Sequence, residues 1–110
     1  MTQELEKVDT YDVKSSKLYD SQYFRFDFRN TYRYKIEWYY LLGFNKDYSE
    51  LKHAWRIPSF DFVDIDNIVI YNNYLGRYNL ENMRQYEITD KILPIFNSWL
   101  DKIKGKKHET

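Results

Sequence analysis

Asp12 and Lys14 are the residues of this 110-residue chain whose types and spacing most directly suggest chemistry. They lie two positions apart in the segment Y-D-V-K-S-S-K-L, residues 11–18. Residues two apart share a face of a β-strand, so we expect the carboxylate and the ammonium group side by side. A carboxylate can bind Mg²⁺, and a neighbouring lysine can stabilise the charge that develops on a phosphate. Asp12 and Lys14 are therefore candidate catalytic residues, with Asp12 as the metal ligand.

The segment Asp12-Val13-Lys14 resembles the third motif of the restriction-endonuclease-like fold, the PD-(D/E)xK nucleases, in which an acid, any residue and a lysine follow one another on a strand. Two later segments, Y-Y-L-L-G-F-N ending at Asn45 and A-W-R-I-P ending at Pro58, look like the strands after the active site in small mobile-element nucleases. The resemblance implies a further acid on a preceding strand, but only eleven residues precede Asp12. It therefore implies a truncated or degenerate domain, with Mg²⁺ as cofactor if the nuclease is active.

The missing acid has few sources in the sequence. Glu4, Glu6 and Asp9 are the acids upstream of Asp12, and Asp9 would point to the opposite face of an ideal strand. A second copy of the chain could also supply the acid across a two-fold axis, so a homodimer is one expectation. The alternative is that Asp12 and Lys14 form an ordinary solvated ion pair, which stabilises a fold only slightly.

A second candidate site combines cations with tyrosines. Guanidinium groups and aromatic faces could follow a nucleic-acid backbone or dock on a protein partner. The alternative is the solvated edge of a sheet, where charges prevent pairing with other chains. Formal net charge is zero, so any nucleic-acid binding must be local. The candidate residues are Arg25, Arg29, Arg33, Lys35, Tyr32 and Tyr34.

Acidic residues form a third candidate site in the segment F-D-F-V-D-I-D, residues 60–66. Asp61, Asp64 and Asp66 alternate with apolar residues and could dock on a basic groove of a protein partner. The alternative is a polar loop with core anchors, and the spacing does not fit a calcium-binding EF-hand. His53 alternates with Leu51 and Trp55, which favours a packed, hydrogen-bonded histidine over a catalytic base.

Alternating patterns predict the elements that must position these residues. Aromatic residues make up 20% of the chain, which favours strands. Lys35–Phe44 is the most apolar stretch and predicts a central strand covered on both faces. It should form a hairpin with the next strand across a turn at residues 45–47. The predicted strands span residues 8–14, 23–29, 35–44, 51–57 and 67–71, with a loop at 72–78 and a helical turn within 80–86.

An amphipathic helix is predicted over residues 89–103. Its apolar stripe consists of Ile92, Ile95, Phe96, Trp99, Leu100 and Ile103. Thr89 is available as the N-cap, Pro94 would delay the regular helix until about Leu93, and Gly105 would end it. We therefore expect an α+β fold: an antiparallel sheet of about five strands with the C-terminal helix packed on it. Residues 1–110 should form one domain, with 1–7 and 105–110 flexible.

Several protein classes find no support in the sequence. The chain has no cysteine, which excludes disulfides and thiolate metal sites. It also lacks a glycine-rich phosphate loop, a G-x-S-x-G elbow and an H-E-x-x-H helix. Its apolar runs are too short to cross a bilayer, and its start is too polar for a signal peptide. We therefore expect a cytoplasmic protein.

Three functional hypotheses follow from these observations. The first is a nuclease-derived binding module of phage or mobile-element origin, which contacts a nucleic-acid-directed enzyme as an anti-CRISPR inhibitor does. The second is a minimal Mg²⁺-dependent endonuclease that uses Asp12 and Lys14. The third is a fragment of a larger enzyme whose amino-terminal part was lost or is encoded separately. Substituting Asp12 and Lys14 should abolish activity under the second hypothesis and leave it intact under the first.

Overall fold

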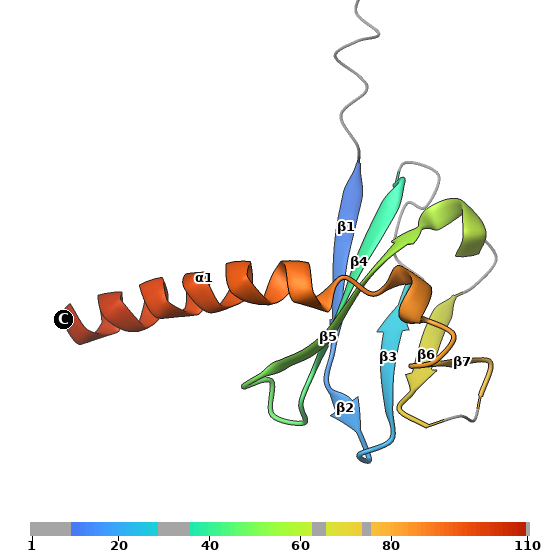
Figure 1. Ribbon diagram of the computed structural model, residues 1–110, viewed down its shortest axis with the longest axis horizontal. Coiled ribbons are helices and arrows are strands. Elements are labelled where there is room, and N and C mark those ends of the chain that lie inside the picture. The colour runs from blue at the N-terminus through green and yellow to red at the C-terminus, as the bar shows by residue number, and fades with distance from the viewer. Residues whose placement is uncertain (1–9, 29–35, 63–65, 74–75, 110) are drawn as a thin grey trace, which may run out of the picture.

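Short strands and one long helix form an α+β fold in the computed structural model, which describes residues 10–28, 36–62, 66–73 and 76–109 (Figure 1). The predicted α+β class is therefore confirmed. Two 3₁₀ turns, η3 (Ser59–Phe62) and η4 (Arg84–Tyr86), follow strands β5 and β7. The main elements are β1 (Tyr11–Ser16), β2 (Leu18–Tyr19), β3 (Tyr23–Asp27), β4 (Trp38–Phe44), β5 (Leu51–Pro58), β6 (Asn67–Tyr71), β7 (Tyr78–Asn79) and α1 (Thr89–Glu109).

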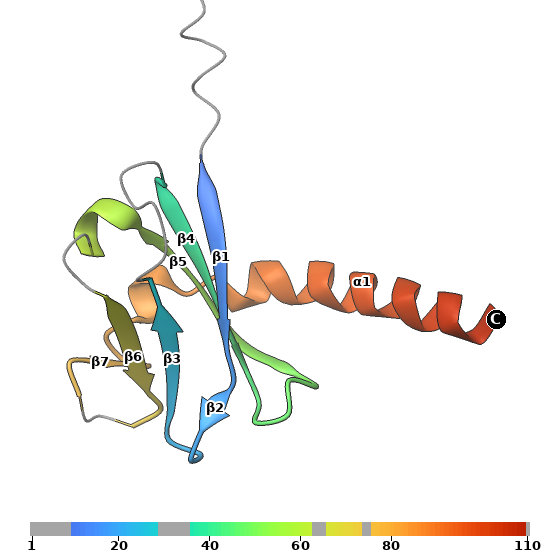
Figure 2. The ribbon, with the colours of Figure 1, turned by 180° about the vertical axis from the view of Figure 1, so that it is seen from behind.

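The strands belong to two sheets, ordered β1-β4-β5 and β2-β3-β6-β7. β1 runs parallel to β4, and β6 runs parallel to β7, whereas the other pairs are antiparallel. The predicted single antiparallel sheet of about five strands is thus wrong in its finer detail. The reason lies at Lys17, which separates β1 from β2: the chain leaves one sheet there and enters the other (Figure 2).

The core lies between the two sheets. Phe24 and Phe26 alternate with exposed residues on β3, and they reach the core with Phe28 just beyond it. Trp55 on β5 is fully buried and meets the rings of Phe24 and Phe26 edge-on, at centroid distances of 5.8 and 6.1 Å. Each such large side chain contributes roughly 1.5–3 kcal/mol by leaving water. Tyr39, Leu41, Ile57, Phe62, Ile68, Ile70 and Met83 complete the core.

The predicted hairpin of β4 and β5 is confirmed. Asn45 closes its turn twice: its backbone N–H donates to the Glu50 carbonyl at 2.9 Å, and its side-chain oxygen accepts a hydrogen bond from the Glu50 amide at 3.0 Å. β4 is the central strand of its sheet, as predicted. However, only the core side of β4 is fully buried, because Trp38, Tyr40 and Leu42 on the other side are half-buried.

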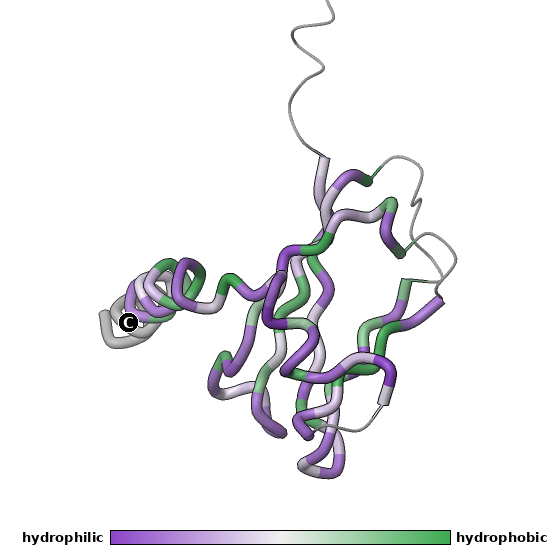
Figure 3. Tube along the Cα trace, turned by 45° about the vertical axis from the view of Figure 1, so that its right-hand side comes forward, coloured by the Kyte–Doolittle hydropathy of each residue, from purple (hydrophilic) through white to green (hydrophobic). Residues whose placement is uncertain are grey.

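Helix α1 differs from its prediction in three respects. It begins at Thr89 and includes Pro94, and it continues through Gly105 to Glu109. It packs on the sheet only near its start, where the ring of Phe96 lies 5.6 Å from that of Phe44. Beyond this contact the helix projects away from the strands (Figures 1 and 2). Neighbouring hydrophobic and hydrophilic segments alternate along the strands, and both kinds occur along α1 (Figure 3).

Other boundaries shift by a few residues. The first strand begins at Tyr11 and ends at Ser16, so the predicted start at Val8 lies outside the described residues. The loop predicted at 72–78 ends in the short strand β7, and the predicted turn within 80–86 is η4. No helix in the described part of the chain is long and apolar enough to cross a membrane.

Candidate functional site

Asp12 and Lys14 lie side by side on β1, as their spacing predicts. The Asp12 Oδ2 and Lys14 Nζ atoms are 3.2 Å apart, and their side chains are 35% and 24% exposed. The other carboxylate oxygen of Asp12 accepts the backbone N–H of Val13 at 2.9 Å. Both side chains share the face of β1 on which Ser16 is buried. The carboxylate is therefore already paired with a cation and a backbone donor.

A groove of about 510 Å³ opens next to this ion pair, where β1 and β3 belong to different sheets. The Ser16 hydroxyl oxygen joins the two strands at this point by accepting the Arg25 backbone N–H at 2.9 Å. The groove carries two cations and one carboxylate, so its local charge is mildly positive. Its lining residues are Lys14, Ser15, Tyr19, Tyr23, Arg25 and Asp27.

Three tyrosines form a ladder, and two of them, Tyr19 and Tyr23, line the groove. Tyr19, Tyr23 and Tyr71 stand at matching positions of β2, β3 and β6. The first two rings are stacked with centroids 5.6 Å apart, and the next pair is tilted at the same distance. The Lys17 ammonium lies 5.1 Å from the centre of the Tyr19 ring. Such a ladder can stack planar groups, and the cation beside it favours an anionic ligand.

A Mg²⁺ site is not complete within the described residues. Asp12 would be the metal ligand, but its carboxylate already binds Lys14 and the Val13 amide. The described part of the chain has no group of three or more histidine, aspartate or glutamate side chains that could hold a metal ion. The upstream acids Glu4, Glu6 and Asp9 lie outside it. The residues placed here therefore do not fit a nuclease metal centre by themselves.

The two other predicted sites are only partly described. Arg25 is exposed on β3 and lines the groove. The remaining members of that site, Arg29, Tyr32, Arg33, Tyr34 and Lys35, lie outside the described residues. Asp61 is exposed in η3, and Asp66 is exposed before β6, where its carbonyl accepts the Phe28 N–H at 2.8 Å. Asp64 lies outside the described residues.

The outer side of the three-stranded sheet is a surface that the sequence reasoning missed. The guanidinium carbon of Arg56 lies 3.6 Å from the centre of the Trp38 ring and 6.0 Å from that of Tyr40. Tyr11 meets Tyr40 edge-on at 5.5 Å. The side chain of Tyr11 is 62% exposed and that of Val13 is 48% exposed. We call this surface the aromatic face; it comprises Tyr11, Val13, Trp38, Tyr40, Leu42, Arg56 and Pro58.

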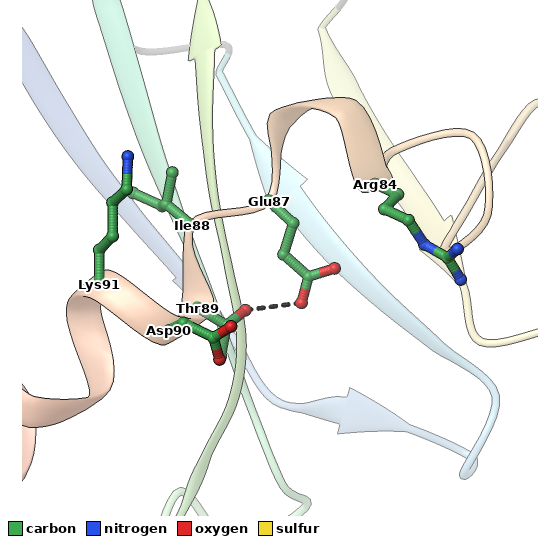
Figure 4. A pocket seen from close by; sticks show the side chains of 6 residues that line it. All are labelled: Arg84, Glu87, Ile88, Thr89, Asp90 and Lys91. Carbon is green, nitrogen blue, oxygen red and sulfur yellow. Dashed lines mark hydrogen bonds between the residues drawn. The ribbon is translucent and has the colours of Figure 1, made fainter.

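A polar cluster joins β5 to the start of α1. Glu87 Oε2 accepts the Thr89 hydroxyl at 2.6 Å (Figure 4). The same carboxylate oxygen lies 2.8 Å from His53 Nδ1. The same hydroxyl oxygen accepts the Ala54 backbone N–H at 2.9 Å, and the His53 ring stacks on Trp55. His53 is thus packed and hydrogen-bonded, as predicted. The adjoining pocket of about 410 Å³ is lined by Arg84, Glu87, Ile88, Thr89, Asp90 and Lys91.

This polar cluster does not have the order of a catalytic triad. In a triad the histidine lies between the hydroxyl and the carboxylate, so that it can take the proton of the nucleophile. Here the carboxylate of Glu87 lies between Thr89 and His53, and one oxygen serves both. The cluster therefore anchors the helix to the sheet. Glu87 is 34 positions from His53, and no local pattern in the sequence signals their contact.

Comparisons of this chain with protein-family models, with curated proteins and with solved structures found no match. Fold alone does not define function, which depends on the residues of a site. Three surfaces of the described chain remain as candidates: the groove beside Asp12 and Lys14, the aromatic face, and the exposed side of α1.

Proposed function

We propose that this chain is a non-catalytic binding module that acts by surface contact on a nucleic-acid-directed enzyme. The observation that carries the proposal is the aromatic face, where Arg56 stacks on Trp38 at 3.6 Å and lies 6.0 Å from Tyr40 on the outer side of the sheet. Tryptophan, tyrosine and arginine dominate the binding energy of many protein interfaces. This face combines all three on neighbouring strands of one sheet.

The side chains of the aromatic face are also preorganised for binding. Its residues stand on β1, β4 and β5, which are held in register by backbone pairing. Stacking on Trp38 restrains the Arg56 side chain before a partner arrives. Ordering a flexible side chain at an interface costs roughly 0.5–1.5 kcal/mol, and a preorganised one avoids part of that cost. The face therefore supports binding more strongly than scattered exposed aromatics would.

The class of partner rests on the resemblance of residues 11–18 to a nuclease motif. A degenerate nuclease domain of phage or mobile-element origin would act on the enzymes that handle the same nucleic acids, as an anti-CRISPR inhibitor of a defence nuclease does. The Asp12–Lys14 pair at 3.2 Å needs no catalytic role, because a partly exposed ion pair commonly contributes about 0–1 kcal/mol to the stability of a fold. Under this proposal the ion pair only stabilises the edge of the sheet.

An inhibition assay tests the proposed function. Purified chain is titrated into cleavage reactions of RNA-guided and restriction nucleases, and wild type should inhibit at least one of them. Val13→Asp places a charge on the aromatic face and should weaken inhibition by about tenfold or more, equivalent to 1.4 kcal/mol. Val69→Asp is the matched control, because Val69 is half-buried on a strand of the other sheet. Lack of inhibition by wild type, or an equal loss in both folded variants, contradicts the proposal.

A second candidate function is a minimal Mg²⁺-dependent endonuclease. It is favoured by one observation, the position of Asp12 and Lys14 at 3.2 Å from each other and next to a groove that also contains Arg25. In such an enzyme Lys14 and Arg25 would hold the phosphate, and a further acid would have to complete the metal site. Cleavage that the double variant Asp12→Ala, Lys14→Ala abolishes is the result that this function requires.

A further inference from the structure

The groove between β1 and β3 contains tyrosines and an arginine that the proposed function does not use. β1 continues through Lys17 into β2, and β3 returns beside both strands (Figure 2). Tyr19, Tyr23 and Arg25 line the groove, whose volume of about 510 Å³ is in the range of sites for small ligands. None of the residues that line it belongs to the aromatic face. Binding in this groove is therefore independent of the proposed function.

The tyrosine ladder is fixed at one end and exposed at the other. Tyr71 is at the fixed end, where a Cβ on Gly76 would lie 2.4 Å from its ring, so the backbone of Gly76 packs directly against the ring. Tyr19 is at the other end and is 37% exposed, although its ring stacks on that of Tyr23. Rings held in this way bind nucleobases by stacking, because every base has a face that can stack. The exposed end of the ladder therefore suits a planar aromatic group.

Two cations flank this end of the ladder. The Lys17 ammonium lies 5.1 Å from the centre of the Tyr19 ring. Arg25 is exposed two residues after Tyr23 on the same face of β3, and it forms no ion pair among the described residues. Ser15 also lines the groove and is exposed, so its hydroxyl can donate a further hydrogen bond. An ammonium, a guanidinium and a hydroxyl group are donors that phosphate oxygens accept.

The charges around the groove are balanced, which limits what electrostatics can contribute. Asp12 and Lys14 neutralise each other at 3.2 Å. Lys17 and Arg25 are accompanied by Asp20 in the turn after β2 and by Asp27 at the end of β3. The groove and its surroundings thus have no excess of positive charge. A ligand must gain its affinity mainly from stacking, so exposed bases matter more than the charge of a backbone.

Single strands expose the bases that such a site needs. In a duplex the base faces are covered by neighbouring bases, whereas in a single strand they can stack on aromatic side chains. We infer that the groove binds single-stranded nucleic acid, with one base stacked on Tyr19 and the adjoining phosphates held by Lys17 and Arg25. Two phosphate contacts predict a shallow salt dependence. The logarithm of the binding constant should fall with the logarithm of the salt concentration with a slope of about −1.4.

Fluorescence anisotropy tests the inference with labelled oligothymidine and oligouridine of about 12 nucleotides, a length within the range that an aromatic groove occupies. EDTA is present, so that no metal-dependent cleavage can occur. Wild type, titrated from about 1 µM to about 500 µM, should bind at least one of these single strands. It should bind a duplex of the same length about tenfold more weakly or worse. An abasic strand, which keeps the phosphates and lacks the bases, should be bound as weakly as the duplex.

Two pairs of variants locate the site. Tyr19→Ala should weaken binding about tenfold by removing the stack. Tyr11→Ala is its control, because Tyr11 is a 62% exposed tyrosine of the aromatic face. Arg25→Ala should weaken binding and make the salt slope shallower by about 0.7. Arg84→Ala is its control, because Arg84 is 75% exposed in η4. Neither control should change binding, and far-ultraviolet circular dichroism shows that each variant is folded.

Three results would overturn the inference. One is the absence of binding to either single strand by wild type at about 500 µM. Another is equally tight binding of the duplex or the abasic strand, or a salt slope much steeper than about −1.4, because charge alone would then account for the affinity. The third is binding that Tyr19→Ala leaves unchanged or that Tyr11→Ala weakens to the same extent.

Discussion

Replacing Thr89 by valine should destabilise the protein through the loss of a single hydroxyl group. Valine has nearly the shape of threonine, so the packing of the side chain is kept. The hydroxyl oxygen accepts the backbone N–H of Ala54 at 2.9 Å, and its proton is donated to Glu87 at 2.6 Å. Ala54 is completely buried, so water cannot replace the lost acceptor. The substitution thus separates the polar contact from the volume of the side chain.

The size of the effect follows from these two hydrogen bonds. An unsatisfied buried donor costs roughly 1–3 kcal/mol, and the weakened Glu87 contact adds to this, so we expect a loss of about 2–3 kcal/mol. For a domain of this size, each kcal/mol lowers the melting temperature by roughly 4 °C or more. Thr89→Val should therefore melt about 10 °C below wild type.

Thermal unfolding followed by circular dichroism measures this difference. Thr89→Ser is the matched control, because serine keeps the hydroxyl and loses only the methyl group. It should melt close to wild type, well above Thr89→Val. Equal melting temperatures for the serine and valine variants would refute the claim that this hydroxyl anchors the start of α1 to β5.

Two further predictions concern β4 and the turn after it. Gly43→Ala should lower the free energy of unfolding by roughly 1–3 kcal/mol, measured by urea titration, because its Cβ would lie 3.0 Å from the buried ring of Phe24. A stability equal to wild type would show that the ring can move aside. Hydrogen bonds from the side chain and backbone of Ser49 hold the pKa of Asp47 below its usual 3.8. Ser49→Ala should therefore raise this pKa in an NMR titration. Because the folded-state pKa is depressed, the stabilisation is present above pH 3.8 and disappears as the pH falls through the folded pKa. An unchanged pKa in the variant would contradict the assigned cause.

The strands were predictable from the sequence because their side chains alternate. Phe24, Phe26 and Phe28 occupy one face of β3 and its continuation, and all three are buried. The same regularity placed Asp12 and Lys14 side by side. Their neighbours could not be predicted in this way, because alternation does not determine which strand pairs with which. The parallel pairing of β1 with β4 is therefore visible only in the structure.

The aromatic face was missed for a related reason. The stretch from Lys35 to Phe44 is apolar at nearly every position, which predicts a strand covered on both faces. The structure leaves its Trp38 and Tyr40 side half-buried, and Arg56 from the next strand stacks on it. Helix α1 likewise keeps its predicted apolar stripe but packs only the part near Phe96 on the sheet. Sequence periodicity identifies an apolar face and cannot say what covers it.

The central claim is that this chain binds without cleaving, and a nucleic-acid cleavage assay tests it most directly. Mg²⁺ and Mn²⁺ are titrated into wild type with labelled single- and double-stranded DNA and RNA, with the Asp12→Ala, Lys14→Ala double variant alongside. We predict no metal-dependent cleavage by either protein, because the account assigns Asp12 and Lys14 to an ion pair that stabilises the edge of the sheet. Metal-dependent cleavage by wild type that disappears in the double variant would contradict the account and establish a nuclease.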